Sequence, residues 1–287
     1  MKNFETAIVP LPADIRRAMQ NLDINTKSKA EEIRLRAGGK ISVLHSGRES
    51  IIMPERRVTA QDIAIIIENA TGASVHSAAD SIRSGFVTME HGHRLGVCGT
   101  AVVRNNEISM LRAFSSINIR VARQIKGAAD GIILQAENTL IISPPGAGKT
   151  TLLRDMIRQL SDSGVRCAVC DERGEIAAMH RGIPQFDVGT RTDVLTGAPK
   201  AEGIMLLLRS MSPQVIAVDE ITASEDVKAI EQSVNCSVKI IATVHADDIT
   251  EIEQRTATRD LLSRGLFKKI VMINAVNGAR KITVYKI

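Results

Sequence analysis

The stretch from residue 140 to residue 153 constrains the fold of this 287-residue chain more than any other. A short apolar run, Leu140–Ile142, ends at a Pro-Pro-Gly turn, and the pattern of an amphipathic helix begins after Gly148. A phosphate-binding loop requires this order of strand, glycine-containing loop and helix. Gly146 and Gly148 allow backbone N–H groups to close around a phosphate, and the helix directs the positive end of its dipole at the same anion. We therefore predict a nucleotide site here.

The residues beside these glycines supply further ligands. Lys149 adds a positive charge for the phosphates, and the Thr150 hydroxyl can bind a Mg²⁺ ion that bridges them. Ser143 stands where the common form of the motif has its first glycine, and a serine at a strand end is compatible with the turn. The predicted nucleotide-binding residues are Ser143, Pro144, Pro145, Gly146, Ala147, Gly148, Lys149, Thr150 and Thr151.

Apolar runs that alternate with helical patterns follow the loop. They are Val165–Cys170, Val215–Val218, Lys239–Val244 and Ile270–Ile273. Such an alternation is typical of a mostly parallel sheet covered by helices on both faces. Asn277-Gly278 predicts a turn into a final antiparallel strand over residues 281–287. We expect an α/β core that spans residues 139–287.

The residues before the loop predict a separate α+β domain at 1–126, joined to the core by a hinge at 127–138. Its expected elements are a helical lead-in over about the first 30 residues, a β meander from Ile33 to Met53, a helix that starts at the capping signature Thr59–Asp62 and is closed by Gly72, a short helix across Val75–Arg83, and β-hairpins from Phe86 to Val121.

Composition excludes several classes of protein. No apolar run is long enough to span a bilayer, and the N-terminus lacks a charged and then apolar leader. We therefore expect an intracellular protein whose membrane role is peripheral. The net charge of +5 allows an acidic partner, but one Tyr, five Phe and no Trp disfavour single-stranded nucleic acid, which needs aromatic stacking platforms.

Two short motifs could be read as metal ligands. Cys167-x-x-Cys170 has the spacing of a zinc or redox site, but it lies in an apolar run without a second pair, so a buried strand is the better interpretation. His91-Gly-His93 could also hold a metal, and here we favour a polar hairpin tip.

Acidic residues follow the apolar run Val215–Val218. We expect this strand to lie directly beside the strand that carries the loop, with Asp219 in the Mg²⁺ shell and Glu220 polarising the attacking water. Glu172, at another strand end, is a rival or helper for the same task. His245 follows a third strand, where it could donate a hydrogen bond to a γ-phosphate.

Phosphoryl transfer also needs a cation for the charge that develops on the γ-phosphate. The core offers two candidates, Arg191 and Arg209. The N-terminal domain offers four, Arg94, Arg112, Arg120 and Arg123.

Together these residues resemble the secretion-type P-loop ATPases of the RecA-like superfamily, within it the branch that acts in endospore formation. The stretches that carry the resemblance are Glu32–Ala37, Gly92–Gly99, Ser116–Arg123, Ser143–Thr151, Asp171–Ile176, Arg209–Pro213, Asp219–Glu220 and Thr243–Ala246. The resemblance implies ATP and Mg²⁺ as ligands, a homo-hexameric ring, and an N-terminal domain joined by a hinge to a RecA-like core. It assigns the acidic box to Asp171–Glu175 and the histidine box to His245.

The same resemblance implies that Arg94, Arg120 or Arg123 approaches the nucleotide. It places ATP hydrolysis in the mother-cell cytoplasm, peripheral at the forespore membrane, where it powers or assembles a channel made of membrane proteins of the same sporulation system. Two other functions stay open. A nucleic-acid-dependent RecA-like motor would be stimulated by DNA or RNA, and a nucleotide-switched assembly factor would bind ATP and scarcely turn it over.

Overall fold

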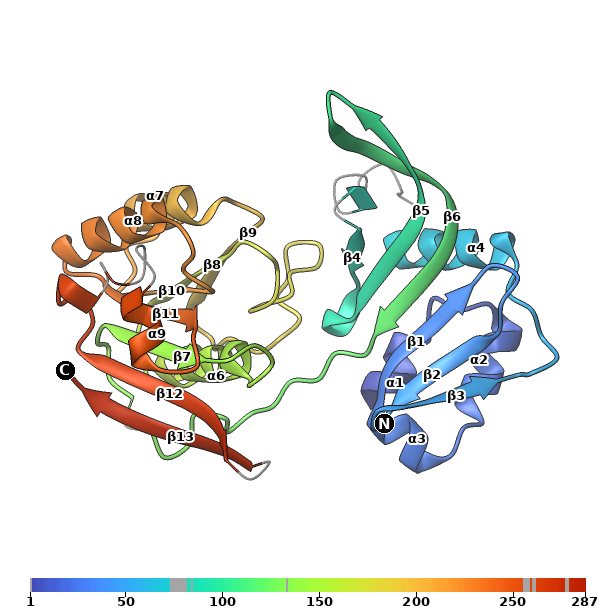
Figure 1. The fold of residues 1–287 in the computed structure, drawn as a ribbon, viewed down its shortest axis with the longest axis horizontal. Coiled ribbons are helices and arrows are strands. Elements are labelled where there is room, and N and C mark those ends of the chain that lie inside the picture. The colour runs from blue at the N-terminus through green and yellow to red at the C-terminus, as the bar shows by residue number, and fades with distance from the viewer. Residues whose placement is uncertain are drawn as a thin grey trace. The chain divides into compact units, whose positions relative to one another are not determined.

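A computed structural model describes residues 2–287 of the chain apart from 73–81, 84, 133, 255–258, 260–261 and 277–278. The chain divides into two compact units, Met1–Arg123 and Gln124–Ile287. Each unit has a sheet of its own (Figure 1). The first unit has one cluster of buried hydrophobic residues, and the second has one on each face of its sheet.

The first unit is an antiparallel sheet covered on one face by helices. Its strand order is β3-β2-β1-β6-β5-β4. The strands are β1 (Ala30–Arg36), β2 (Ile41–His45), β3 (Arg48–Ile52), β4 (Phe86–Thr88), β5 (Arg94–Arg104) and β6 (Glu107–Arg120), and the helices are α1 (Lys2–Ala7), α2 (Ala13–Gln20), α3 (Ile24–Lys29) and α4 (Ala60–Thr71). The helical lead-in is thus three short helices, and the helix expected across Val75–Arg83 falls largely outside the described residues.

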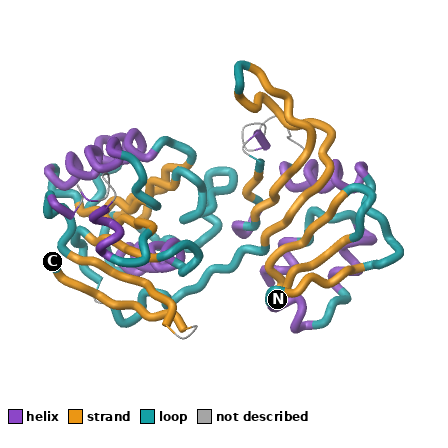
Figure 2. Tube along the Cα trace, viewed as in Figure 1, coloured by secondary structure: helices purple, strands orange, loops and turns teal. Residues whose placement is uncertain are grey.

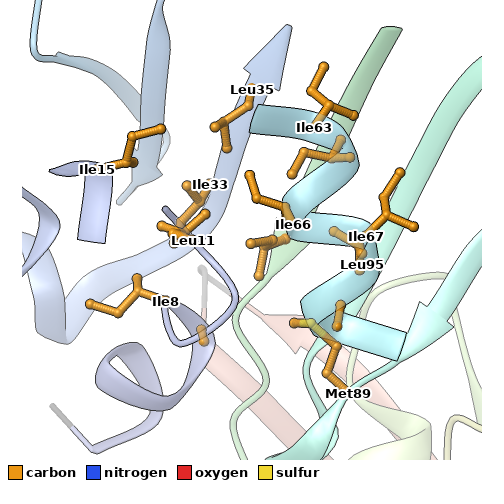
Figure 3. Packing of buried hydrophobic residues seen from close by; sticks show 14 of the residues in the cluster. Ile8, Leu11, Ile15, Ile33, Leu35, Ile63, Ile66, Ile67, Met89 and Leu95 are labelled. Carbon is orange, nitrogen blue, oxygen red and sulfur yellow. The ribbon is translucent and has the colours of Figure 1, made fainter. Parts of the chain in front are cut away.

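Alternation of apolar and polar residues decides which face of this sheet is buried. Ile33 and Leu35 of β1 are fully buried, whereas Arg36 on the other face is exposed. Ile63 and Ile66 of α4 pack on the same core, together with α1 and α2 (Figure 3).

Two local signals of the first unit are confirmed. Thr59 caps α4 in a capping box with Asp62, and Gly72 ends it in the left-handed conformation. Asn105 and Asn106 turn the chain from β5 into β6 with φ of 51° and 65°, which asparagine tolerates better than most residues.

The interpretation of His93 as part of a polar hairpin tip is wrong. The side chain is 1% exposed, its Nδ1 accepts the Ala122 N–H at 3.0 Å, and its Nε2 lies 2.8 Å from the Thr6 hydroxyl. Because Nδ1 accepts, the proton of the neutral ring sits on Nε2 and is donated to Thr6. His93 therefore ties β5 to α1 and to the end of the unit.

The second unit is built on a seven-stranded, mostly parallel sheet with the order β13-β12-β7-β11-β10-β8-β9. The strands are β7 (Thr139–Ser143), β8 (Cys167–Asp171), β9 (Thr192–Thr196), β10 (Val215–Val218), β11 (Lys239–His245), β12 (Lys269–Val276) and β13 (Ala279–Lys286). Only β13 runs antiparallel to its neighbour, as expected for the final strand; the predicted turn at residues 277–278 lies outside the described residues.

Helices cover both faces of this sheet, as predicted. The helix α6 (Lys149–Asp162) packs on one face against Ile141 and Val169. On the other face α7 (Lys200–Ser210), α8 (Ser224–Asn235) and α9 (Ile249–Gln254) pack against Leu140 and Ile216 (Figures 1 and 2).

Two expectations about the sheet need correction. The strand β10 does not lie beside β7, because β11 is inserted between them. The strand β9 was not expected, because this half-exposed edge strand lacks a continuous apolar run.

Cys167 and Cys170 are buried in β8, as the strand interpretation requires. Burial raises the pKa of Cys167 to about 12 and that of Cys170 to about 11, so both stay protonated thiols at neutral pH.

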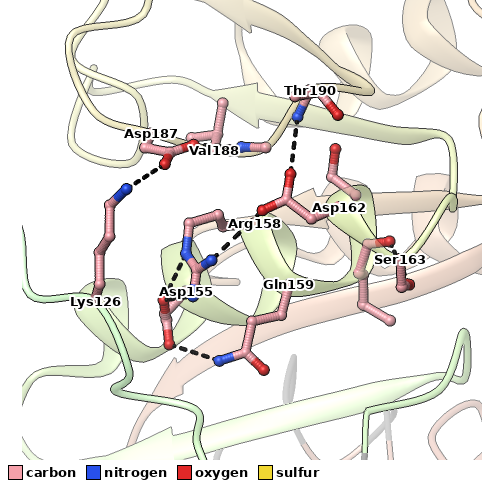
Figure 4. Close-up of polar contacts among 12 residues, drawn as sticks. Lys126, Asp155, Arg158, Gln159, Asp162, Ser163, Asp187, Val188 and Thr190 are labelled. Carbon is pink, nitrogen blue, oxygen red and sulfur yellow. Dashed lines mark hydrogen bonds and ion pairs between the residues drawn. The ribbon is translucent and has the colours of Figure 1, made fainter.

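Polar contacts fix the start of the second unit to α6 and to the loop before β9 (Figure 4). Lys126 donates to Asp187 at 2.6 Å, and the Ala129 N–H donates to the buried Asp155 at 2.9 Å. Arg158 donates twice to Asp155. Movement at residues 127–138 as a hinge stays a prediction. Among the described residues, no helix is long and apolar enough to cross a membrane.

Candidate active site

The loop after β7 has the backbone that its glycines predict. Gly146 and Gly148 adopt φ of +76° and +92°, the region that favours glycine, and Gly148 is the N-cap of α6. Ser143 is fully buried at the end of β7, and its hydroxyl donates to the Pro144 carbonyl at 3.0 Å. The serine that replaces the usual first glycine therefore bonds within the turn itself.

Lys149, the first residue of α6, points toward the neighbouring strand β11. Its Nζ lies 3.0 Å from His245 Nδ1 and also contacts Nε2. The sheet explains this meeting, because His245 pairs with Ser143 in the β7–β11 register. Burial lowers the pKa of Lys149, opposed by the nearby carboxylates of Asp219 and Glu220.

Thr150 and Asp219 come together at the carboxyl ends of the parallel strands, although β11 lies between β7 and β10. The Thr150 hydroxyl lies 3.5 Å from one Asp219 oxygen, and the Thr243 hydroxyl of β11 donates to the other at 2.8 Å. A carboxylate and a hydroxyl at the start of a phosphate-loop helix are the oxygen ligands that Mg²⁺ prefers. The residues present therefore fit the predicted metal, with Thr243 fixing the orientation of Asp219.

Glu220 lies two residues after the end of β10 and has a strained backbone, with φ of +30°. Its N–H donates to the Thr243 hydroxyl at 2.9 Å, and its carbonyl accepts from Lys200 Nζ at 2.8 Å. Its carboxylate lies 3.6 Å from His245 Nε2 and 3.4 Å from Arg173. The side chain thus faces the same space as Lys149 and His245.

Glu172 is placed differently from Glu220. It accepts from Lys200 at 3.1 Å, and Lys200, only 7% exposed, also lies 3.7 Å from Asp226. One buried cation therefore holds both glutamates, Glu172 by its side chain and Glu220 by its backbone. Sequence reasoning missed Lys200, because it opens a helix outside any motif.

The loop after β8 is organised by Asp171, the first residue of the predicted acidic box. Its carboxylate accepts three backbone N–H groups, from Glu175, Ile176 and Ala177, at 2.8–3.0 Å. Burial raises the pKa of Asp171, and these hydrogen bonds oppose the rise. Arg154 of α6 donates to the carbonyls of Glu175 and Ile176, so this part of the box is scaffold.

The structure does not bring Arg191 or Arg209 to the loop within one chain. Arg209 lies in the last turn of α7, before β10 begins, and donates to the Met205 carbonyl. Arg191 directly precedes β9 and donates to the Gly164 carbonyl. Both therefore lie by the amino ends of the strands, whereas Asp219 lies at the carboxyl ends.

The arginines predicted in the first unit are engaged within that unit. Arg94 lies over the Phe86 ring at 3.4 Å, and Arg120 lies 3.7 Å from Glu32. Arg123 donates to the carbonyls of Ser28 and Ala30. Arg112 pairs with Thr100 across the β5–β6 hairpin. Their approach to a nucleotide stays a prediction.

With this geometry in place, comparison with known proteins gives the family. A family model described as "Sporulation stage III, protein AA" matches residues 3–286. The chain belongs to this family. Stage III sporulation protein AA of Bacillus subtilis (strain 168) is 34% identical over 279 residues, which cover 93% of this chain and 90% of that protein.

Solved structures agree with the fold of this family member. The X-ray structure of the Legionella pneumophila ATPase DotB has a TM-score of 0.61 at 18% identity and covers 96% of this chain and 80% of its own. The pilus retraction motor PilT with bound ADP has a TM-score of 0.62 at 15% identity, covering 94% and 80%. The predicted fold, a RecA-like α/β core after an α+β region, is confirmed.

Proposed function

We propose that this member of the sporulation stage III AA family binds ATP with Mg²⁺ and hydrolyses it at the carboxyl edge of its second sheet. One observation carries the proposal: Lys149 and Thr150 of α6, Asp219 and Glu220 after β10, and His245 at the end of β11 meet beside the N-terminus of α6. The fold shared with the Legionella pneumophila ATPase DotB and with the ADP-bound pilus retraction motor PilT supports it.

The residues divide the chemistry among them. Backbone N–H groups of the loop bind the phosphates, and Lys149 exchanges His245 for a phosphate oxygen. Thr150 and Asp219 would hold Mg²⁺, and the ion would supply positive charge that neutralises the phosphates. Glu220 accepts a proton from the attacking water while the oxygen of that water bonds to the γ-phosphorus. The bond from the γ-phosphorus to the β–γ bridging oxygen breaks, releasing ADP and inorganic phosphate, while His245 donates a hydrogen bond to the γ-phosphate.

We further propose that the chain works as a homo-oligomeric ring, as the resemblance to secretion ATPases implies. Arg191 and Arg209 lie by the amino ends of the strands, away from the phosphate loop. The remaining cation would therefore come from the first unit of a neighbouring subunit, as Arg94, Arg120 or Arg123. Mixing an arginine-to-alanine subunit with a Lys149→Ala subunit restores turnover if the cation acts between subunits. No restoration with any of the three rejects that assignment.

The proposed setting is the mother-cell cytoplasm, at the forespore membrane. There the ring would power or assemble a channel formed by membrane proteins of the sporulation system. Family membership supports this setting. Pull-down from sporulating cells with Glu220→Gln, which should retain ATP, tests the membrane partners.

The deciding experiment measures steady-state ATP hydrolysis with Mg²⁺ by the intact chain and by Glu220→Gln. Loss of a positioned general base lowers kcat by about 10²- to 10⁴-fold. ATP binding should remain, because Glu220 makes no part of the phosphate loop. The matched control is Glu202→Gln, an exposed carboxylate on α7. Full turnover by Glu220→Gln, or no turnover by the unchanged chain, rejects hydrolysis at this site.

A further inference from the structure

Arg280, in the C-terminal strand β13, lies against the phosphate loop from the side opposite the catalytic carboxylates. A Cβ atom placed on Gly148 would lie 3.9 Å from Arg280 Cζ and 4.0 Å from Nη1. The guanidinium therefore covers the backbone at the N-cap of α6. None of the motifs in the sequence includes this residue.

The sheet register explains how a residue so late in the chain reaches the loop. The last β7–β12 pair is Ile142 with Met272, whereas Arg280 pairs with Ala275, three residues further along β12. The β12–β13 hairpin thus extends past the carboxyl end of β7, alongside the loop. Side chains alternate along β13, so Arg280 shares a face with Ile282, which packs on the core that contains α6.

Among the residues that the structure describes, no carboxylate lies within ion-pair distance of the Arg280 guanidinium. Other cations of this unit do have a carboxylate partner: Lys126 pairs with Asp187, Arg158 with Asp155 and Lys200 with Glu172. Arg280 is an exposed residue, and partial burial of its guanidinium lowers its pKa. A guanidinium can bind a phosphate through two parallel N–H···O hydrogen bonds.

The two sides of the loop differ in what they offer a nucleotide. Lys149 and Thr150 face β11 and β10, where Asp219 and Glu220 are. A triphosphate bound with its terminal phosphate toward Glu220 would have its nucleoside end toward β12 and β13. We propose that Arg280 binds the nucleotide at this end, on the α-phosphate, and thereby sets affinity for ATP and ADP alike. The proposal rests on the function proposed above.

Direct binding tests this with ATP and ADP, each with Mg²⁺, on the intact chain and on Arg280→Ala. Loss of one charge-assisted contact raises Kd for both nucleotides by about 10- to 100-fold. The change in kcat at saturating ATP stays within about threefold, since Arg280 does not reach the γ-phosphate. Lys281→Ala, the next residue on the other face of β13, is the control and keeps the original Kd.

Two further variants guard against misfolding and a merely structural role. Arg280→Gln keeps hydrogen-bonding capacity without the charge and should weaken both nucleotides, whereas Arg280→Lys should recover part of the affinity. Unchanged Kd in Arg280→Ala and Arg280→Gln overturns the inference while leaving the proposed function intact. So does a fall in kcat with unchanged ADP binding, which would place Arg280 at the γ-phosphate. Absence of nucleotide binding by the unchanged chain overturns both.

Discussion

Replacing Lys200 with methionine is the most informative single change to the scaffold of the site. Lys200 is 7% exposed and its Nζ joins three acceptors: the Glu220 carbonyl at 2.8 Å, Glu172 at 3.1 Å and Asp226 at 3.7 Å. Methionine keeps the length of the side chain but removes the charge. Asp226, itself buried, then loses its cation, and breaking a buried ion pair costs about 3–5 kcal/mol.

The change should also slow catalysis, because the Glu220 backbone loses a bond that holds its φ of +30°. Loss of the ion pair between Lys200 and half-exposed Glu172 adds little to the loss of stability, since such pairs contribute at most about 1 kcal/mol. Urea unfolding at neutral pH measures the stability, and kcat for ATP measures the positioning. Lys228→Met, at an exposed position of α8, is the control. A loss below about 1 kcal/mol together with unchanged kcat would refute this account of Lys200.

Three further changes probe the rest of the scaffold. Burial lowers the pKa of His93 to about 4 from 6.5, so its folded form holds fewer protons; stability is full above about pH 6.5 and should fall by about 3 kcal/mol as the pH drops toward 4, and His93→Gln should flatten this dependence in urea titrations. Gly203→Ala places a Cβ 2.5 Å from Cys170 Sγ and should cost about 1–3 kcal/mol in the same assay. Asp155→Ala orphans the Ala129 N–H and should speed proteolysis of the segment around residue 129 about tenfold; an unchanged rate contradicts the anchoring.

The parts of the site that sequence could predict are those encoded locally. The loop from Ser143 to Thr151 is one continuous segment, and its glycines indicate the positive φ angles that the loop adopts. Strand ends such as Asp219 and His245 follow apolar runs, so their common sheet edge follows from the parallel architecture.

The parts that sequence could not predict depend on contacts between distant segments. The order of parallel strands is set by crossover connections, so β11 could lie between β7 and β10 without any local sign. Lys200 and Arg280 gain their roles only when separate elements bring acceptors or the loop beside them. His93 looked polar in sequence and is buried because Thr6 and Ala122, far along the chain in both directions, satisfy its ring.

Calorimetric titration of the unchanged chain and of Lys149→Ala with ATP and Mg²⁺ tests the central claim most directly. We expect one nucleotide bound per chain, and about 100-fold weaker binding by the variant because a phosphate loses its charged donor. Equal affinity in the two proteins, or no heat of binding from the unchanged chain, would contradict a nucleotide site where β7 leads into α6.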